Sequence, residues 1–121
     1  LDENRKTRDY LYGRLLAIAD NLEEWALRTA GENRQTNAAR LMQRFAEHPY
    51  STWRTIELAL VPYKARLGNK ATKHLRLITE VMNMFDPDDF TNDRKLSGEF
   101  LLGYHCQREA LWRKEGDSEK A

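Results

Sequence analysis

The strongest constraint on the fold is the spacing of apolar residues near the start of the chain. Large apolar side chains recur there at steps of four and three, at Leu11, Leu15, Ile18, Leu22 and Trp25. Such steps place side chains on one face of an α-helix. Thr7 suits the N-cap of this helix, and Gly31 suits its end. The spacing therefore predicts one long amphipathic helix, and its length favours an elongated bundle.

Composition extends the helical prediction to the whole chain. The 121 residues include 16 leucines and 12 alanines, against 3 isoleucines and 2 valines. Leucine and alanine, which are not branched at Cβ, favour helices, and β-branched residues favour strands. A chain of this length suits one domain. We predict an all-α fold, with a single elongated bundle of about five helices over residues 1–121 and a frayed polar tail over about 115–121.

Two further helices are predicted in the next part of the chain. One should start near Thr36 and stop before Pro49, and the next should start at Ser51 or Thr52. Pro62 lacks a backbone donor, so it should kink or break the helix that contains it.

The last two helices follow a glycine. Gly68 should end the preceding segment, and Asn69 can cap a fourth helix. The last helix is expected over about residues 97–114, where Gly103 should allow close contact with another helix. The apolar stripe of this helix is predicted to comprise Phe100, Leu101, Tyr104, Leu111 and Trp112.

The single cysteine indicates the redox state of the protein's compartment and raises the question of a catalytic thiol. One cysteine excludes an internal disulfide framework and favours a reducing compartment, so we expect a cytoplasmic protein. The apolar runs are too short for a membrane span or a secretory signal. His105 precedes Cys106, but neighbours on a helix point about 100° apart and cannot form a nucleophile–base pair. We therefore predict that these two residues do not form a catalytic dyad.

An acidic run over residues 86–95 is the candidate metal site. Asp86 and Asp88 match the opening of an EF-hand loop, but Phe90 stands where that loop needs a ligand. Asp86 instead suits a helix N-cap, with acids in the first turn. We predict neither a metal nor a cofactor. The alternative is a metal nuclease built on Asp86, Asp88, Asp89 and Asp93.

Charge is distributed unevenly along the chain, although the formal net charge is only +1. Residues 34–76 contain nine basic side chains against Glu47 and Glu57. An excess of this size in one segment can produce a strong local field. Two interpretations remain open, a surface that binds phosphates and a solvated face with salt bridges. A helix-turn-helix reader is disfavoured, because it needs a polar recognition helix after a short turn.

We predict a nucleic-acid-binding groove from the basic segment. Its candidate residues combine cations with an amide donor, the groups that contact phosphates in protein–DNA complexes. They are Arg34, Asn37, Arg40, Arg44, Arg54, Lys64, Lys70 and Lys73.

Four segments resemble the C-terminal helical region of the Csd1 family, the large-subunit proteins of type I-C CRISPR–Cas systems. In the family this region is also made separately, by internal translation, as a small subunit of the Cascade complex. The segments are RDYLYGRLLAIADNLEE (8–24), TNAARLMQRFAEHPYSTWRTIE (36–57), FDPDDFT (85–91) and LSGEFLLGYHCQREAL (96–111). The first methionine is Met42, so we expect the chain to lack its natural start or to be part of a longer product.

The resemblance implies a non-catalytic subunit of an RNA-guided surveillance complex. It would line the complex beside the backbone and large subunits and head-to-tail copies of itself. It would bind the backbone of target or displaced DNA to stabilise the R-loop in antiviral defence, with indirect contact to crRNA. Sequence would be read by the guide RNA. The alternatives are a structural spacer that contacts Cascade proteins or crRNA, and a stand-alone helical DNA-binding domain.

Overall fold

The computed structural model describes the backbone of residues 1–120 and the side chains as far as Arg113. All regular structure within these residues is helical, which confirms the all-α prediction. The elements in chain order are α1 (Arg8–Thr29), α2 (Asn37–Arg40), α3 (Met42–Glu47), α4 (Pro49–Ala59), α5 (Val61–Leu67), a 3-10 turn η1 (Gly68–Ala71), α6 (Thr72–Met84), α7 (Pro87–Phe90) and α8 (Glu99–Lys120).

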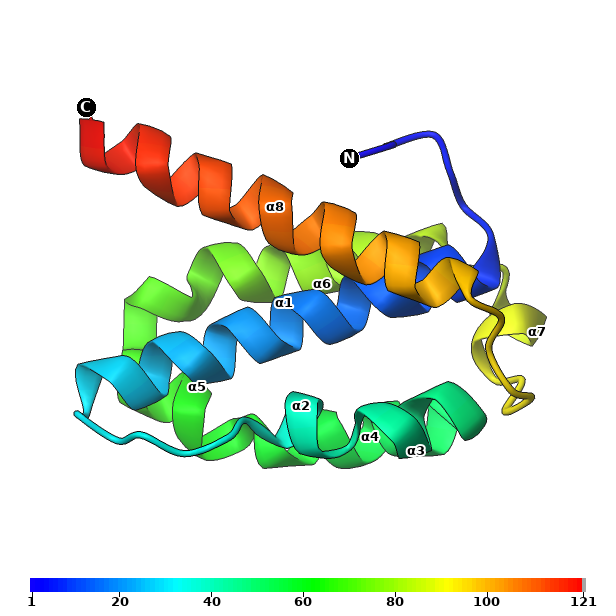
Figure 1. Cartoon of the computed structure of the whole chain (residues 1–121), viewed down its shortest axis with the longest axis horizontal. Helices are drawn as coiled ribbons and strands as arrows, with labels where there is room; N and C mark the ends of the chain where they lie inside the picture. The colour runs from blue at the N-terminus through cyan, green and yellow to red at the C-terminus, as the bar shows by residue number, and fades with distance from the viewer. Residues whose placement is uncertain (121) are drawn as a thin grey trace.

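Helix α1 lies at the centre of the bundle. Helices α6 and α8 pack on one side of it, and α2, α4 and α5 pack on the other (Figure 1). Every residue from Tyr10 to Asp20 is buried, so the helix is covered all round. The prediction of a single apolar face was therefore wrong in this respect. Polar residues of α1 that would face water on an amphipathic helix have protein partners instead.

The second predicted helix is interrupted. It begins near Thr36 as predicted, and the Thr36 hydroxyl caps it by accepting from the Ala39 amide at 3.0 Å. Leu41 leaves the helical conformation, at φ −98° and ψ 7°, and separates α2 from α3. Its side chain is buried, so the distortion accompanies packing against the core.

The third helix begins earlier than predicted. Helix α4 starts at Pro49 rather than at Ser51 or Thr52. Proline is favoured in a first turn because the amide it lacks would be unpaired there. The cap comes from a distant part of the chain. Asp93 accepts from the amides of Tyr50 and Ser51 at 2.9 and 3.1 Å.

Pro62 and Gly68 interrupt the helical chain between α4 and α6 nearly as predicted. Pro62 lies in the first turn of α5, which separates that helix from α4. Gly68 ends α5 with a positive φ of 56°. Asn69 does not cap the next helix, because it lies inside η1, and α6 begins at Thr72 without a side-chain cap.

Helices α1 and α8 cross with their backbones in contact. A Cβ atom added to Gly13 would lie 1.9 Å from the carbonyl oxygen of Phe100. One added to Gly103 would lie 2.1 Å from the carbonyl oxygen of Tyr10. Only glycine fits at either position, which confirms the role predicted for Gly103.

The inward face of α8 differs from the predicted stripe. Phe100, Tyr104 and Leu111 are buried as predicted, but Leu101 is exposed and Trp112 is 75% exposed. Gln107 takes an inward position, because its side-chain oxygen accepts from Arg14 of α1 at 2.7 Å. Helix α8 continues past its predicted end to Lys120, and the side chains of the predicted frayed tail lie outside the described residues. None of the described helices has the length and apolar character that a membrane span needs.

An aromatic cluster attaches α7 to the bundle. The Tyr12 ring of α1 stacks on Phe90 at 5.8 Å and meets Phe85 edge-on at 4.8 Å. The Tyr12 hydroxyl donates to the Phe90 carbonyl. Arg8 then donates to the carbonyls of residues 92, 94 and 95, which fixes the connection to α8.

His74 makes stability depend on pH. Its Nε2 lies 2.7 Å from the Asn21 side-chain oxygen, while Nδ1 is buried without a partner among the described residues. Burial and the nearby Lys73 charge lower the pKa of His74 to about 4. The unfolded chain takes up this proton near pH 6.5, so the folded state loses relative stability as the pH falls from about 6.5 to about 4.

We expect the free energy of unfolding to fall by about 3 kcal/mol between about pH 6.5 and about pH 4, because the unfolded chain binds the His74 proton and the folded chain does not. Urea unfolding at pH 7 and at pH 4 would measure the loss. A His74→Gln variant should lose less stability than the parent chain between the two values, since carboxylates contribute equally to both. Equal losses would show that His74 does not titrate as described.

Candidate nucleic-acid interface

The eight predicted residues are distributed over most of the bundle. Arg34 lies before α2, Asn37 and Arg40 lie on α2, and Arg44 lies on α3. The other four lie one each on α4, α5, η1 and α6, namely Arg54, Lys64, Lys70 and Lys73. Because α6 packs on the opposite side of α1 from α2 and α4, these residues do not surround one groove (Figure 1).

Arg34 and Asn37 are held by a carboxylate of the central helix. Glu23 is buried, and its oxygens accept from the Asn37 amide at 2.9 and 3.0 Å. The Arg34 guanidinium lies 3.2 Å from the same carboxylate. Burial raises the pKa of Glu23, although the Asn37 and Arg34 contacts oppose the rise. These two residues thus connect the segment before α2 to α1.

Arg54 and Lys64 share an acidic neighbour. Burial raises the pKa of Glu57, and the charges of Lys64 and Arg54 oppose the rise. Arg54 also donates to the Tyr50 hydroxyl at 3.1 Å. Their charge is therefore partly balanced by the protein itself.

Arg40 and Arg44 form an outward basic pair. The buried residues of this segment are Ala38, Leu41 and Phe45, at helical steps of three and four, and both arginines are exposed between them. Within the described residues, neither guanidinium has a carboxylate oxygen within 4.0 Å, and Arg40 donates only to the Asn37 side chain. This outward basic pair is the part of the predicted set best placed to contact an external anion.

Lys70 and Lys73 lie away from the outward basic pair. Lys70 lines a hollow of about 300 Å³ at one end of the bundle, together with Arg66 and Leu67. Lys73 lines a separate pocket between α6, α8 and the N-terminal segment. Each lysine therefore belongs to a different surface.

A comparison with protein-family models shows which family the chain belongs to. Residues 1–112 match the model of a family described as CRISPR-associated protein (Cas_Csd1). The chain belongs to the Csd1 family. This confirms the family resemblance predicted from the sequence. A search of curated proteins finds no match to the chain.

Two carboxylates in the acidic run of this Csd1 chain cap helices, those of Asp86 and Asp93. Asp86 caps α7 by accepting from the Asp88 amide at 3.0 Å, as predicted. Asp93 caps α4 and lies 3.6 Å from His48. Among the described residues, no three histidine, cysteine or acidic side chains are grouped so that they could hold a metal ion.

Sequence reasoning about this Csd1 chain overlooked Arg14. Arg14 is buried on α1 and lines the same pocket as Lys73. A signal was present, because Arg14 lies between Tyr12 and Leu15 in a segment that is apolar on every side. An arginine in such surroundings is expected to be buried rather than solvated.

Proposed function

We propose that this Csd1-family chain is a non-catalytic small subunit of a type I-C Cascade, which binds the backbone of target or displaced DNA and stabilises the R-loop. The observation that carries the proposal is the outward basic pair, Arg40 and Arg44, on a chain of this CRISPR-associated family. Arg54 of α4 and Lys64 of α5 would extend the contact over neighbouring helices.

The mechanism requires only positioned cations. Arginine carries a fixed positive charge and a planar fork that matches the oxygens of a phosphate. Contact with the backbone releases counterions and gives affinity without sequence preference. Base pairing with the guide RNA would then supply specificity. The small subunit would hold the separated strands while that pairing extends.

A structural spacer is the second candidate, and a different observation favours it. Leu58 on α4 is 74% exposed, and Val61 on α5 is 56% exposed. Trp112 projects from α8. Large apolar side chains at the surface are typical of contacts with other proteins. In this role the chain would join Cascade subunits or further copies of itself, and the basic residues would serve assembly.

The test is reversal of the outward basic pair. Arg40→Glu with Arg44→Glu should weaken binding of a labelled single strand at least tenfold in about 50 mM salt, because two phosphate contacts become repulsive. The log–log salt slope should fall by about 1.4. Fluorescence anisotropy over a salt series measures both quantities.

The matched control is Arg28→Glu with Arg76→Glu, which changes net charge equally at exposed positions on α1 and α6, outside the helices that carry the outward basic pair. It should weaken binding less than the reversal of the pair. The DNA-binding proposal fails if the pair variant, built into the whole complex, still forms the R-loop as the parent does. If the pair variant instead prevents assembly, as native mass spectrometry would show, the spacer is favoured.

A further inference from the structure

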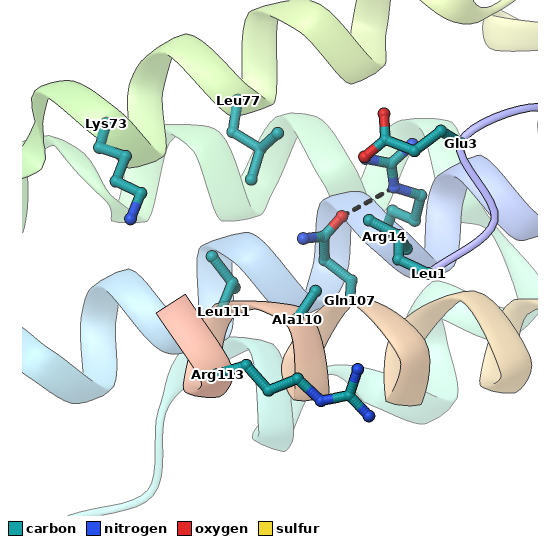
Figure 2. A pocket seen from close by; sticks show the side chains of 9 residues that line it. All are labelled: Leu1, Glu3, Arg14, Lys73, Leu77, Gln107, Ala110, Leu111 and Arg113. Atoms are coloured by element: carbon teal, nitrogen blue, oxygen red, sulfur yellow. Dashed lines mark hydrogen bonds between the residues drawn. The ribbon is translucent and has the colours of Figure 1, made fainter. Parts of the chain in front are cut away.

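A pocket of about 270 Å³ lies between α6, α8 and the segment that precedes α1 (Figure 2). Its walls are largely aliphatic, with Leu77 from α6 and Leu111 from α8. Lys73 reaches toward it from α6, and Arg113 projects from α8 near its edge. The space is close to the lower limit of sites that enclose small ligands, so it suits a single side chain.

The interior of this pocket contains a buried cation. Arg14 is only 1% exposed. Its Nε donates to the Gln107 oxygen at 2.7 Å, and one terminal nitrogen lies 3.5 Å from the Met84 sulfur. No carboxylate oxygen of the described side chains lies within 4.0 Å of the guanidinium. Since buried charges in proteins are normally paired, Arg14 has the capacity to accept an anion that enters the pocket.

The lining of the pocket indicates which anion it accepts. Glu3 of the chain's own N-terminal segment already lines it, so a glutamate side chain fits the space. Leu1, two residues earlier, lines it as well. No aromatic side chain of the described residues takes part, whereas sites for single strands normally offer aromatic rings on which bases stack. A carboxylate next to an aliphatic side chain therefore fits the pocket better than a nucleotide.

The N-terminal segment is held over the pocket by few contacts. The Asp2 amide donates to the Tyr10 hydroxyl at 3.2 Å, and Arg5 pairs with Glu99 at 2.6 Å. Glu3 is exposed, and among the described residues it makes no ion pair within 4.0 Å. Displacing Glu3 from the pocket therefore breaks no ion pair between Glu3 and another described residue.

We propose that this pocket is a docking site for an acidic segment of a partner protein, in which a glutamate follows a leucine two residues earlier. The partner's carboxylate binds Arg14, with Lys73 contributing positive charge, and its leucine contacts Leu77 and Leu111. Glu3 occupies the site in the free chain and is displaced on docking. This gives Lys73 a protein partner, separate from the strand-binding role of the outward basic pair.

The probe is the capped peptide acetyl-Ala-Leu-Asp-Glu-Asn-amide, added to the 121-residue chain carrying Glu3→Gln. Its counterpart has glutamine in place of glutamate. Nuclear magnetic resonance would follow the Arg14 Nε–H signal and the methyl groups of Leu77 and Leu111. The glutamate peptide should shift these signals to saturation and bind at least fivefold more tightly than the glutamine peptide. The parent chain, with Glu3 in place, should bind it more weakly.

Two variants locate the site without altering the buried arginine. Lys73→Gln with Arg113→Gln should weaken binding of the glutamate peptide severalfold. Arg28→Gln with Lys95→Gln should leave that affinity unchanged. The proposal is overturned if the two peptides bind equally, or if neither shifts the signals at about 10 mM. It is also overturned if thymidine 3′,5′-diphosphate binds more tightly than the glutamate peptide, which would indicate a phosphate site. None of these outcomes depends on strand binding by Arg40 and Arg44.

Discussion

Replacement of Gly103 by alanine is expected to destabilise the fold by about 3 kcal/mol or more. The added methyl group would lie 2.1 Å from the Tyr10 carbonyl oxygen, far inside van der Waals contact. The obstacle is the backbone of a buried helix, which cannot rotate away as a side chain could. By helix propensity alone, alanine would stabilise the helix by about 1 kcal/mol relative to glycine. The expected destabilisation is what remains after the steric cost has exceeded that gain.

Urea unfolding followed by circular dichroism measures this loss. Gly98→Ala is the matched control, because nothing lies within 4 Å of a Cβ at that position. It should change stability by no more than about 0.5 kcal/mol. Gly13→Ala should resemble Gly103→Ala, since its Cβ would meet the Phe100 carbonyl. If Gly103→Ala is as stable as Gly98→Ala, the two helices do not cross as closely as described.

Replacement of Asp20 by alanine should cost about 3 kcal/mol. The carboxylate accepts from the hydroxyls of Thr36 and Tyr104 and pairs with Arg108. It thereby joins α1, the start of α2 and α8. Burial raises the pKa of Tyr104 to about 12, with the Asp20 charge adding to the rise, so the phenol remains a donor at neutral pH. Without Asp20, two hydroxyls and a guanidinium lose their shared acceptor.

Glu24→Ala is the comparison for this variant. Glu24 lies 3.7 Å from the same arginine, but its side chain is 42% exposed, against 5% for Asp20. Surface pairs of this kind contribute at most about 1 kcal/mol. Asp20→Asn, which keeps the shape and one acceptor, should fall between the two alanine variants. A loss at Asp20 no greater than at Glu24 would contradict the described network.

The helical elements could be predicted from the sequence because their signals are local. Thr7, Thr36 and Gly68 lie at the ends of helices as predicted from residue type alone. The break at Leu41 and the early start of α4 could not be predicted in this way. Leu41 is distorted where its side chain enters the core, and Pro49 begins a helix whose cap, Asp93, lies more than forty residues later.

The buried side of each helix was harder to predict, because it depends on the helices that pack against it. A single stripe on α1 was expected, but α6, α8 and the α2–α5 layer surround that helix. On α8 the polar Gln107 points inward and the apolar Trp112 points outward. Gln107 is buried because Arg14 needs an acceptor. Apolar periodicity contains no information about such polar pairs between helices.

The prediction of the candidate interface was limited in the same way, because it also depended on partners from other segments. Arg40 and Arg44 could be placed on one face from their spacing, and both are exposed there. Asn37 satisfied the same spacing argument and Arg34 was included for its charge, yet Glu23 holds both of them. A count of charges within residues 34–76 could not include a carboxylate from another segment. The local excess of basic residues therefore overstated the number of cations available to a ligand.

The position of α1 has a consequence for how the chain is made. A ribosome makes this helix before it makes α8, the helix that covers α1 at Gly13 and Gly103. Contacts between distant parts of a chain form slowly, because the intervening loop must close first. The side of α1 that α8 covers therefore remains open until the other helices of the bundle have been made. The complete core, which includes Leu111, can form only after that residue has left the exit tunnel.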